Sequence, residues 1–206
     1  MKEKCTELVF ILDRSGSMAG LEADTIGGYN SMLKKQKEAE GEAFVTTVLF
    51  NHDYETLHNR LDVNSVAPLT GKDYEVGGTT ALLDAIGTTI HKIKGQSSEQ
   101  VLFVITTDGM ENSSCEFNYQ EIKKLIEQQK ELGWQFIFLG ANIDAIGTAS
   151  DLGIDSDYAV EYHADEIGMQ VNFSVVTETV LKYRKEGKIE SSWKEEIEED
   201  YKSRKL

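Results

Sequence analysis

The chain has 206 residues, of which 40 % are hydrophobic and 28 % charged, a composition typical of a globular domain with a sizeable core. Its 36 Asp and Glu residues outnumber its 21 Lys and Arg residues, which gives a formal net charge of −15. So acidic a chain repels phosphate backbones and anionic membranes, and no run of about 18 apolar residues predicts a membrane-spanning helix. We therefore expect neither nucleic acid nor a membrane as a partner.

The first half of the chain predicts strands and a helix, with one hairpin. Residues 7–12 form a nearly continuous apolar run, which is typical of a strand covered on both faces. A helix is predicted over 25–40, and strands are predicted over 44–50 and 54–58. The short turn between these two strands makes one strand antiparallel to its neighbour. The segment 59–76 that follows shows no regular pattern.

The second half predicts a regular alternation of helices and strands. In chain order these are helix 80–94, strand 101–106, helix 119–132, strand 136–139, helix 144–152, strand 158–162 and helix 166–186. Such alternation implies a mostly parallel sheet covered on both sides. We therefore predict an α/β fold with a Rossmann-like, doubly wound, mostly parallel central sheet, one antiparallel edge strand and helices on both faces.

The last segment of the chain differs from the rest in its high charge. We predict one domain over residues 1–187 and a charged helical extension over residues 188–206. Within this extension Trp193, Ile197 and Tyr201 lie on a narrow apolar stripe at helical spacing. This stripe suits a helix that either docks on the domain or binds a partner.

The cysteine content and the start of the chain favour a reducing compartment. Cys5 precedes the first predicted strand and Cys115 follows a later one, so a parallel sheet would place them at opposite ends and prevent a disulfide. The N-terminal residues carry Glu3 and Glu7 and too few apolar residues for a secretion signal. We expect a cytoplasmic protein.

Oxygen-bearing side chains cluster where buried strands end. The first strand leads into Asp13, Ser15 and Ser17 in a D-x-S-G-S arrangement, and the strand over 101–106 leads into Asp108. Thr80 stands at the start of a helix after two glycines. In open α/β sheets, ligands bind at the carboxyl ends of the strands near the point where strand order reverses. We therefore expect these five side chains to converge.

The chemistry of this group points to a hard divalent cation. Two carboxylates and three hydroxyls supply only oxygen, with neither Cys nor His, and Mg²⁺ prefers such ligands, with Mn²⁺ or Ca²⁺ as alternatives. An ion held by few protein charges stays electrophilic, so a carboxylate of another molecule could occupy an open position. The sequence therefore predicts a metal site formed by Asp13, Ser15, Ser17, Thr80 and Asp108.

These residues resemble the metal-ion-dependent adhesion site of the von Willebrand factor type A (vWA) domain family. The likeness rests on D-x-S-G-S, on the Gly-Gly-Thr-Thr stretch and on Thr107-Asp108-Gly109, and it extends over residues 5–187. The family threonine could match Thr79 or Thr80, and the spacing to the following helix favours Thr80. The resemblance implies a protein-binding domain that recognises an Asp or Glu of a partner through its metal ion.

The same resemblance implies that neighbouring loop residues surround the metal site. By their positions next to the ligands, Arg14, Met18, Met110 and Glu111 would form its rim and influence the choice of partner. Arg14 could also be simply solvated.

Other interpretations of these loops remain as alternatives. Asp13 and Ser15 could merely cap the next helix. An aspartyl-phosphate enzyme would need a second Asp where Ser15 stands, and no dinucleotide fingerprint or Walker A sequence occurs. We therefore assign no catalytic residue and no organic cofactor, and we expect no enzyme. The rivals are a metal-assisted phosphatase or hydrolase and a scaffold subunit that acts through residues 188–206.

Overall fold

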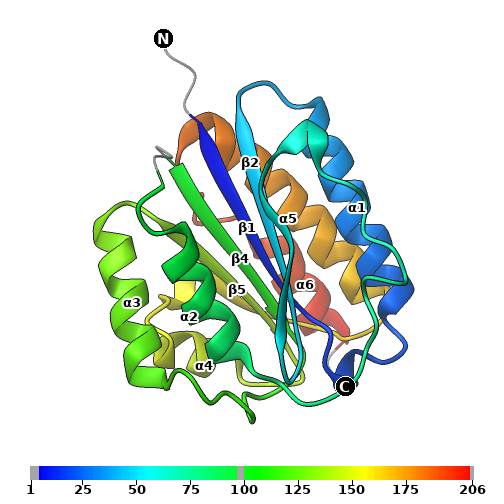
Figure 1. Cartoon of the computed structure of the whole chain (residues 1–206). Coiled ribbons are helices and arrows are strands. Elements are labelled where there is room, and N and C mark those ends of the chain that lie inside the picture. The colour runs from blue at the N-terminus through cyan, green and yellow to red at the C-terminus, as the bar shows by residue number, and fades with distance from the viewer. Residues whose placement is uncertain (1–4, 97–99, 205–206) are drawn as a thin grey trace.

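The computed structural model describes residues 5–96 and 100–204 and shows a six-stranded sheet in the order β3-β2-β1-β4-β5-β6 (Figure 1). The strands are β1 (Thr6–Asp13), β2 (Ala43–Phe50), β3 (Tyr54–Asp62), β4 (Gln100–Thr107), β5 (Gln135–Ala141) and β6 (Ala159–Tyr162). Neighbouring strands pair in parallel except for the edge strand β3, which pairs antiparallel with β2. The predicted fold class is confirmed. Of the N-terminal residues considered above, residues 1–4 lie outside the described part.

Helices cover both faces of the sheet. They are α1 (Glu22–Glu38), α2 (Leu82–Ile93), α3 (Tyr119–Glu131), α4 (Ala145–Asp151), α5 (Glu166–Glu186) and α6 (Glu195–Arg204). Figure 1 shows α2, α3 and α4 on one side of the sheet and α1, α5 and α6 on the other. Within the described ranges, none of the helices has the length and apolar character needed to cross a membrane.

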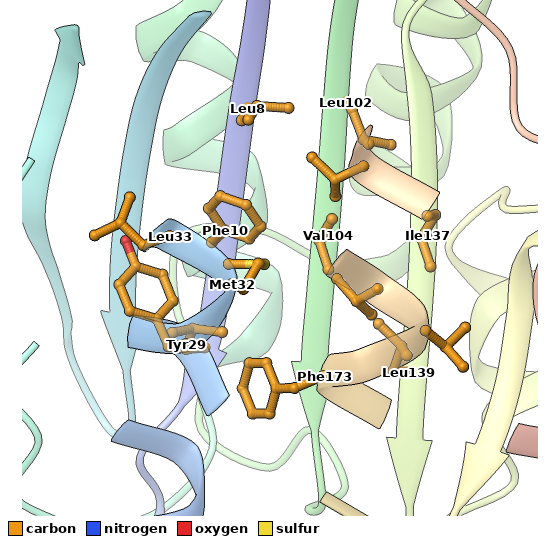
Figure 2. Close-up of a cluster of buried hydrophobic side chains, with 14 of the residues drawn as sticks. Leu8, Phe10, Tyr29, Met32, Leu33, Leu102, Val104, Ile137, Leu139 and Phe173 are labelled. Carbon is orange, nitrogen blue, oxygen red and sulfur yellow. The ribbon is translucent and has the colours of Figure 1, made fainter. Parts of the chain in front are cut away.

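Two hydrophobic cores follow from the alternation of side chains along each strand. On β1, Leu8 and Phe10 face the helices α1 and α5, while Val9 and Ile11 belong to the core under α2, α3 and α4. Figure 2 shows the first of these cores, with side chains of β1, β4 and β5 meeting those of α1 and α5. The central strands are buried on both faces, as their continuous apolar runs predict.

Strand β3 is longer than the sequence predicts, because residues 59–62 belong to it rather than to an irregular segment. Arg60 has a positive φ of 49°, and the strand pairing shifts register in this region. Its guanidinium forms an ion pair at 3.0 Å with Glu7, whose side chain is fully buried in β1. Its backbone N–H donates to the hydroxyl of Thr46. Contacts with β1 and β2 therefore extend β3 beyond the point where its sequence stops showing a strand pattern.

Gly28 lets α1 approach α5 closely. A Cβ atom placed on Gly28 would lie 2.2 Å from the Phe173 ring of α5, whereas one on the adjacent Gly27 would meet nothing within 4 Å. Gly28 is therefore needed for the contact between the two helices, whereas Gly27 faces open space.

This pair gives a matched test of α1–α5 packing. Gly27→Ala is expected to raise the free energy of unfolding by about 0.5–1 kcal/mol, because alanine favours the helix. Gly28→Ala is expected to lower it by about 1–3 kcal/mol through overpacking against Phe173. Urea denaturation of both variants measures the difference, and equal stabilisation by the two alanines would contradict the close contact.

The C-terminal extension docks on the domain. The side chains of Trp193 and Ile197 are buried in the core that contains α5, and Trp193 donates its indole N–H to the Asp157 carbonyl at 2.8 Å. Lys194 donates to the carbonyls of Ser156 and Ala159, at the start of the edge strand β6. The extension therefore packs against the start of β6 and the turn before it, which is the first of the two alternatives predicted from the apolar stripe.

The cysteines lie where the sequence predicts. Cys5 directly precedes β1, and Cys115 is an exposed residue in the loop beyond the carboxyl end of β4. They are therefore at opposite ends of the sheet.

Candidate metal centre

The five predicted ligands meet at the carboxyl ends of β1 and β4. Asp13 is the last residue of β1, and Ser15 and Ser17 follow it in a loop with one short 3₁₀ turn. Asp108 directly follows β4, and Thr80 lies just before α2. Adjacent strands β1 and β4 are where the chain order across the sheet reverses, which is the usual ligand position in open α/β sheets.

Asp13 is the more deeply placed of the two carboxylates, and two hydrogen bonds hold its side chain in position. It is 1 % exposed, and its Oδ1 accepts the backbone N–H of Ser15 at 2.6 Å. Its Oδ2 accepts the hydroxyl of Thr107 at 2.5 Å. These two bonds orient the carboxylate and hold the loop that carries Ser15 against the end of the sheet.

Three hydroxyls surround one point beside Gly109. The Oγ atoms of Ser15 and Ser17 are 3.1 Å apart, and Ser17 donates to Asp108 Oδ1 at 2.5 Å. A Cβ placed on Gly109 would lie 2.8 Å from Thr80 Oγ1, 3.2 Å from Ser17 Oγ and 3.5 Å from Ser15 Oγ. Only glycine leaves this point open, and the exposed Ser17 connects it to solvent.

The donor set suits a hard cation. Asp108 accepts the Ser17 hydroxyl through Oδ1, and its buried Oδ2 has no hydrogen-bond partner among the described residues, so this carboxylate is only partly satisfied within the chain. Across residues 5–96 and 100–204, no three His, Cys, Asp or Glu side chains gather as a metal cluster. The convergent group instead combines two carboxylates with three hydroxyls, a mixture that fits Mg²⁺ better than a softer metal.

Burial raises the pKa of both carboxyl groups. The pKa of Asp13 is raised by desolvation, which outweighs its hydrogen bonds from Ser15 and Thr107. Burial also raises the pKa of Asp108 to about 6, with a smaller contribution from the negative charge of Asp13. Two desolvated carboxylates in one group favour protonation or a nearby positive charge.

This raised pKa predicts a pH dependence of the metal-free protein. The folded chain keeps the Asp108 proton between pH 3.8 and about 6, where the unfolded chain has lost it. The contribution of Asp108 to the free energy of unfolding therefore falls as pH rises through this range, by at most about 1.4 kcal/mol per pH unit.

The measurement is the difference in unfolding free energy between wild type and Asp108→Asn in metal-free buffer. Taking this difference cancels the contributions of other carboxylates, such as Asp165 and Glu198, which are common to both proteins. The pKa values of these two groups are lowered, so their contributions to the free energy of unfolding rise with pH. Parallel pH profiles for the two proteins would contradict the prediction.

The residues expected to rim the group behave differently from one another. Met110 is 73 % exposed beside it, as a rim residue should be, but Met18 is 1 % exposed and lies in the core, so its predicted rim position is wrong. Arg14 forms an ion pair with Glu55 at 3.0 Å and is not simply solvated. Glu111 accepts backbone N–H groups of its own loop and of α2, and thus shapes the loop.

Two residues of the group were not predicted. Thr107 bonds Asp13, and the buried Tyr74 donates its hydroxyl to the Asp13 carbonyl. Thr107 had a signal in its position beside Asp108 at the end of a strand. Tyr74 had none, because it lies in the segment without a regular pattern.

Comparisons with known proteins rest on structure. No protein-family model matches the sequence, and no curated protein matches it either. The vWF domain of the type V pili tip protein Mfa5 from Porphyromonas gingivalis is similar with a TM-score of 0.66 and 9 % identity, covering 92 % of this chain and 99 % of that one. The ArnB paralog VWA2 from Sulfolobus acidocaldarius gives a TM-score of 0.54 and 20 % identity over 85 % of this chain and 44 % of that one.

Another similar structure is proximal thread matrix protein 1 (PTMP1) from the mussel byssus, with a zinc-occupied MIDAS motif. Its TM-score is 0.63 at 13 % identity, over 87 % of this chain and 46 % of that one. The chain likewise spans 62 % of the PilB minor pilin from Streptococcus sanguinis. Such identities establish the fold alone. The chain therefore has the Rossmann-like α/β fold of vWA domains.

Proposed function

We propose that the chain is a protein-interaction domain that uses a divalent cation, Mg²⁺ first, to recognise an acidic residue of a partner. The observation that carries the proposal is the meeting of the Ser15, Ser17 and Thr80 hydroxyls at one point beside Gly109. Two carboxylates adjoin them, because Asp108 accepts the Ser17 hydroxyl and Asp13 accepts the backbone N–H of Ser15. If these side chains only capped helices, nothing would require hydroxyls and carboxylates from three separate loops to lie together. A shared ligand explains why they do.

In this proposal each residue has a distinct part. Ser15, Ser17 and Thr80 offer neutral oxygen atoms, while Asp13 and Asp108 supply the negative charge. When bound, the ion supplies a positive centre that attracts a carboxylate. The exposed Ser17 and Met110 mark the side from which a partner could approach.

The structural neighbours support the proposal through what their names state. One is a pilus adhesin, SpaC from Lactobacillus rhamnosus GG, another is a pilus tip protein, and a third carries a zinc-occupied MIDAS motif. In our proposal the present chain binds rather than catalyses. The cytoplasmic location predicted from the sequence belongs to the same proposal.

A selection experiment tests the proposed function directly. A random peptide library is panned against the immobilised chain in Mg²⁺, and bound peptides are eluted with EDTA. Recovered peptides are expected to be enriched in Asp or Glu, and replacing that residue by Asn or Gln should abolish binding. Recovery of the same peptides in EDTA would contradict metal dependence, and turnover of a phosphoester that EDTA abolishes would favour the enzyme instead.

The adjacent threonines provide a matched test of the ligand set. Thr80 is 3 % exposed with its hydroxyl in the group, while Thr79 is exposed. Thr80→Ala is expected to weaken Mg²⁺ binding at least tenfold, a loss of the size seen when a supporting group of a metal site is removed. Thr79→Ala should leave it unchanged. Isothermal titration calorimetry measures both, and the reverse result would assign Thr79 as the ligand.

A further inference from the structure

A row of three residues crosses the sheet beneath the candidate metal centre. Thr107 of β4 pairs with Gly140 of β5, and the next residue of β5, Ala141, pairs with Tyr162 of β6. Asp108, the residue after Thr107, therefore stands level with Ala141 and Tyr162.

All three members of the row belong to the same face of the sheet. Val104 of β4, Leu139 of β5 and Tyr162 of β6 lie in the core that faces α1 and α5, and Figure 2 shows the first two pointing to that side. Ala141 lies in the same core, and Asp108, the first residue after β4, is in phase with Val104. Ala141 carries only a methyl group, so no large side chain of β5 stands between Tyr162 and Asp108 in this row.

The hydroxyl of Tyr162 is available as a donor. Tyr162 is 1 % exposed, and its hydroxyl has no hydrogen-bond partner in the described part of the chain, which is also true of Asp108 Oδ2. The nearby Tyr74 already donates to the Asp13 carbonyl. Burial raises the pKa of Tyr162 well above its usual range, and the charges of Asp108 and Asp13 raise it further, so the phenol keeps its proton.

We propose that Tyr162 is a positioning residue for Asp108. Its hydroxyl donates to Oδ2 through one buried water, since the two atoms form no direct hydrogen bond, and leaves Oδ1 to Ser17 and the ion. This inference rests on the proposed function. Groups that hydrogen-bond a ligating carboxylate fix its orientation, and their removal typically weakens metal binding 10- to 100-fold.

The first test compares two tyrosines that face the same core. Tyr162→Phe is expected to raise the Kd for Mg²⁺ about tenfold in calorimetric titration. Tyr183→Phe is the control, because the hydroxyl of Tyr183 donates to the Val101 carbonyl at 3.0 Å, near the opposite end of β4. Its Kd should equal that of wild type. An unchanged Kd in Tyr162→Phe would overturn the inference.

The second test uses the metal-free protein and a double-mutant cycle. Tyr162→Phe combined with Asp108→Asn is expected to depart from additivity by about fivefold in the unfolding equilibrium constant, whereas Tyr183→Phe combined with Asp108→Asn should be additive. Additivity in both cycles would overturn the inference. If wild type binds no Mg²⁺, the proposed function fails, and this cycle alone decides whether Tyr162 orients Asp108.

Discussion

Asp13→Asn is expected to abolish the stabilisation of the chain by Mg²⁺. At a free Mg²⁺ concentration 100 times Kd, a single site raises the free energy of unfolding of the wild type by about 2.7 kcal/mol. For a chain of this size that corresponds to roughly 5–10 °C in Tm. The variant should show no such rise, because loss of a ligand carboxylate costs more than the roughly 10–100-fold of an outer-shell change.

The substitution should leave the fold intact. Asparagine keeps one oxygen to accept the Ser15 N–H, and its amide can donate to the Thr107 hydroxyl. Since burial raises the pKa of Asp13, removal of its charge is expected to maintain or increase the stability of the metal-free protein. The measurement is Tm with and without Mg²⁺.

Asp53→Asn is the matched control. Asp53 is an exposed carboxylate in the turn between β2 and β3, at the same edge of the sheet, and it accepts a backbone N–H of its own turn. This variant should respond to Mg²⁺ as the wild type does. An equal Mg²⁺ response in Asp13→Asn would reject the metal site itself.

Trp193→Ala is expected to lower the free energy of unfolding by about 3–5 kcal/mol, the range for a buried tryptophan. The side chain is 8 % exposed, packs in the core beside α5 and donates to the Asp157 carbonyl. Its loss leaves a cavity and an unpaired carbonyl. Urea denaturation in metal-free buffer measures the change.

Leu132→Ala is the control, because Leu132 is a large apolar residue that is 70 % exposed. Its effect should stay within about 0.5 kcal/mol. If Trp193→Ala were equally mild, the extension would be loosely attached and its apolar stripe would be available to a partner, as the scaffold alternative requires.

The order of elements could be predicted because most of them carry local signals. Continuous apolar runs identified β1 and β4, and helical spacing identified α2 and α5. The convergence of the five candidate ligands could be predicted for a related reason. Each of the five residues stands at the end of a strand or at the start of a helix, and parallel strands have their carboxyl ends on the same side of the sheet.

The rest depends on contacts between distant segments. Tyr74 reaches Asp13 across 61 positions from a segment with no periodic pattern. The extension of β3 depends on the pairing of Arg60 with Glu7, and the role of Gly28 depends on how α1 meets α5 rather than the sheet. Met18 follows the ligand loop in sequence but turns into the core, because the short 3₁₀ turn redirects it. No local rule specifies these contacts.

The docked extension limits how this sheet could grow by strand addition. An open sheet offers its outer carbonyl and amide groups at both edge strands, and each edge is a template for another chain. At the start of β6, Lys194 already occupies the Ala159 carbonyl, and Trp193 occupies the Asp157 carbonyl just before it. A strand that paired with the start of β6 would therefore first have to displace Lys194 and the extension that carries it.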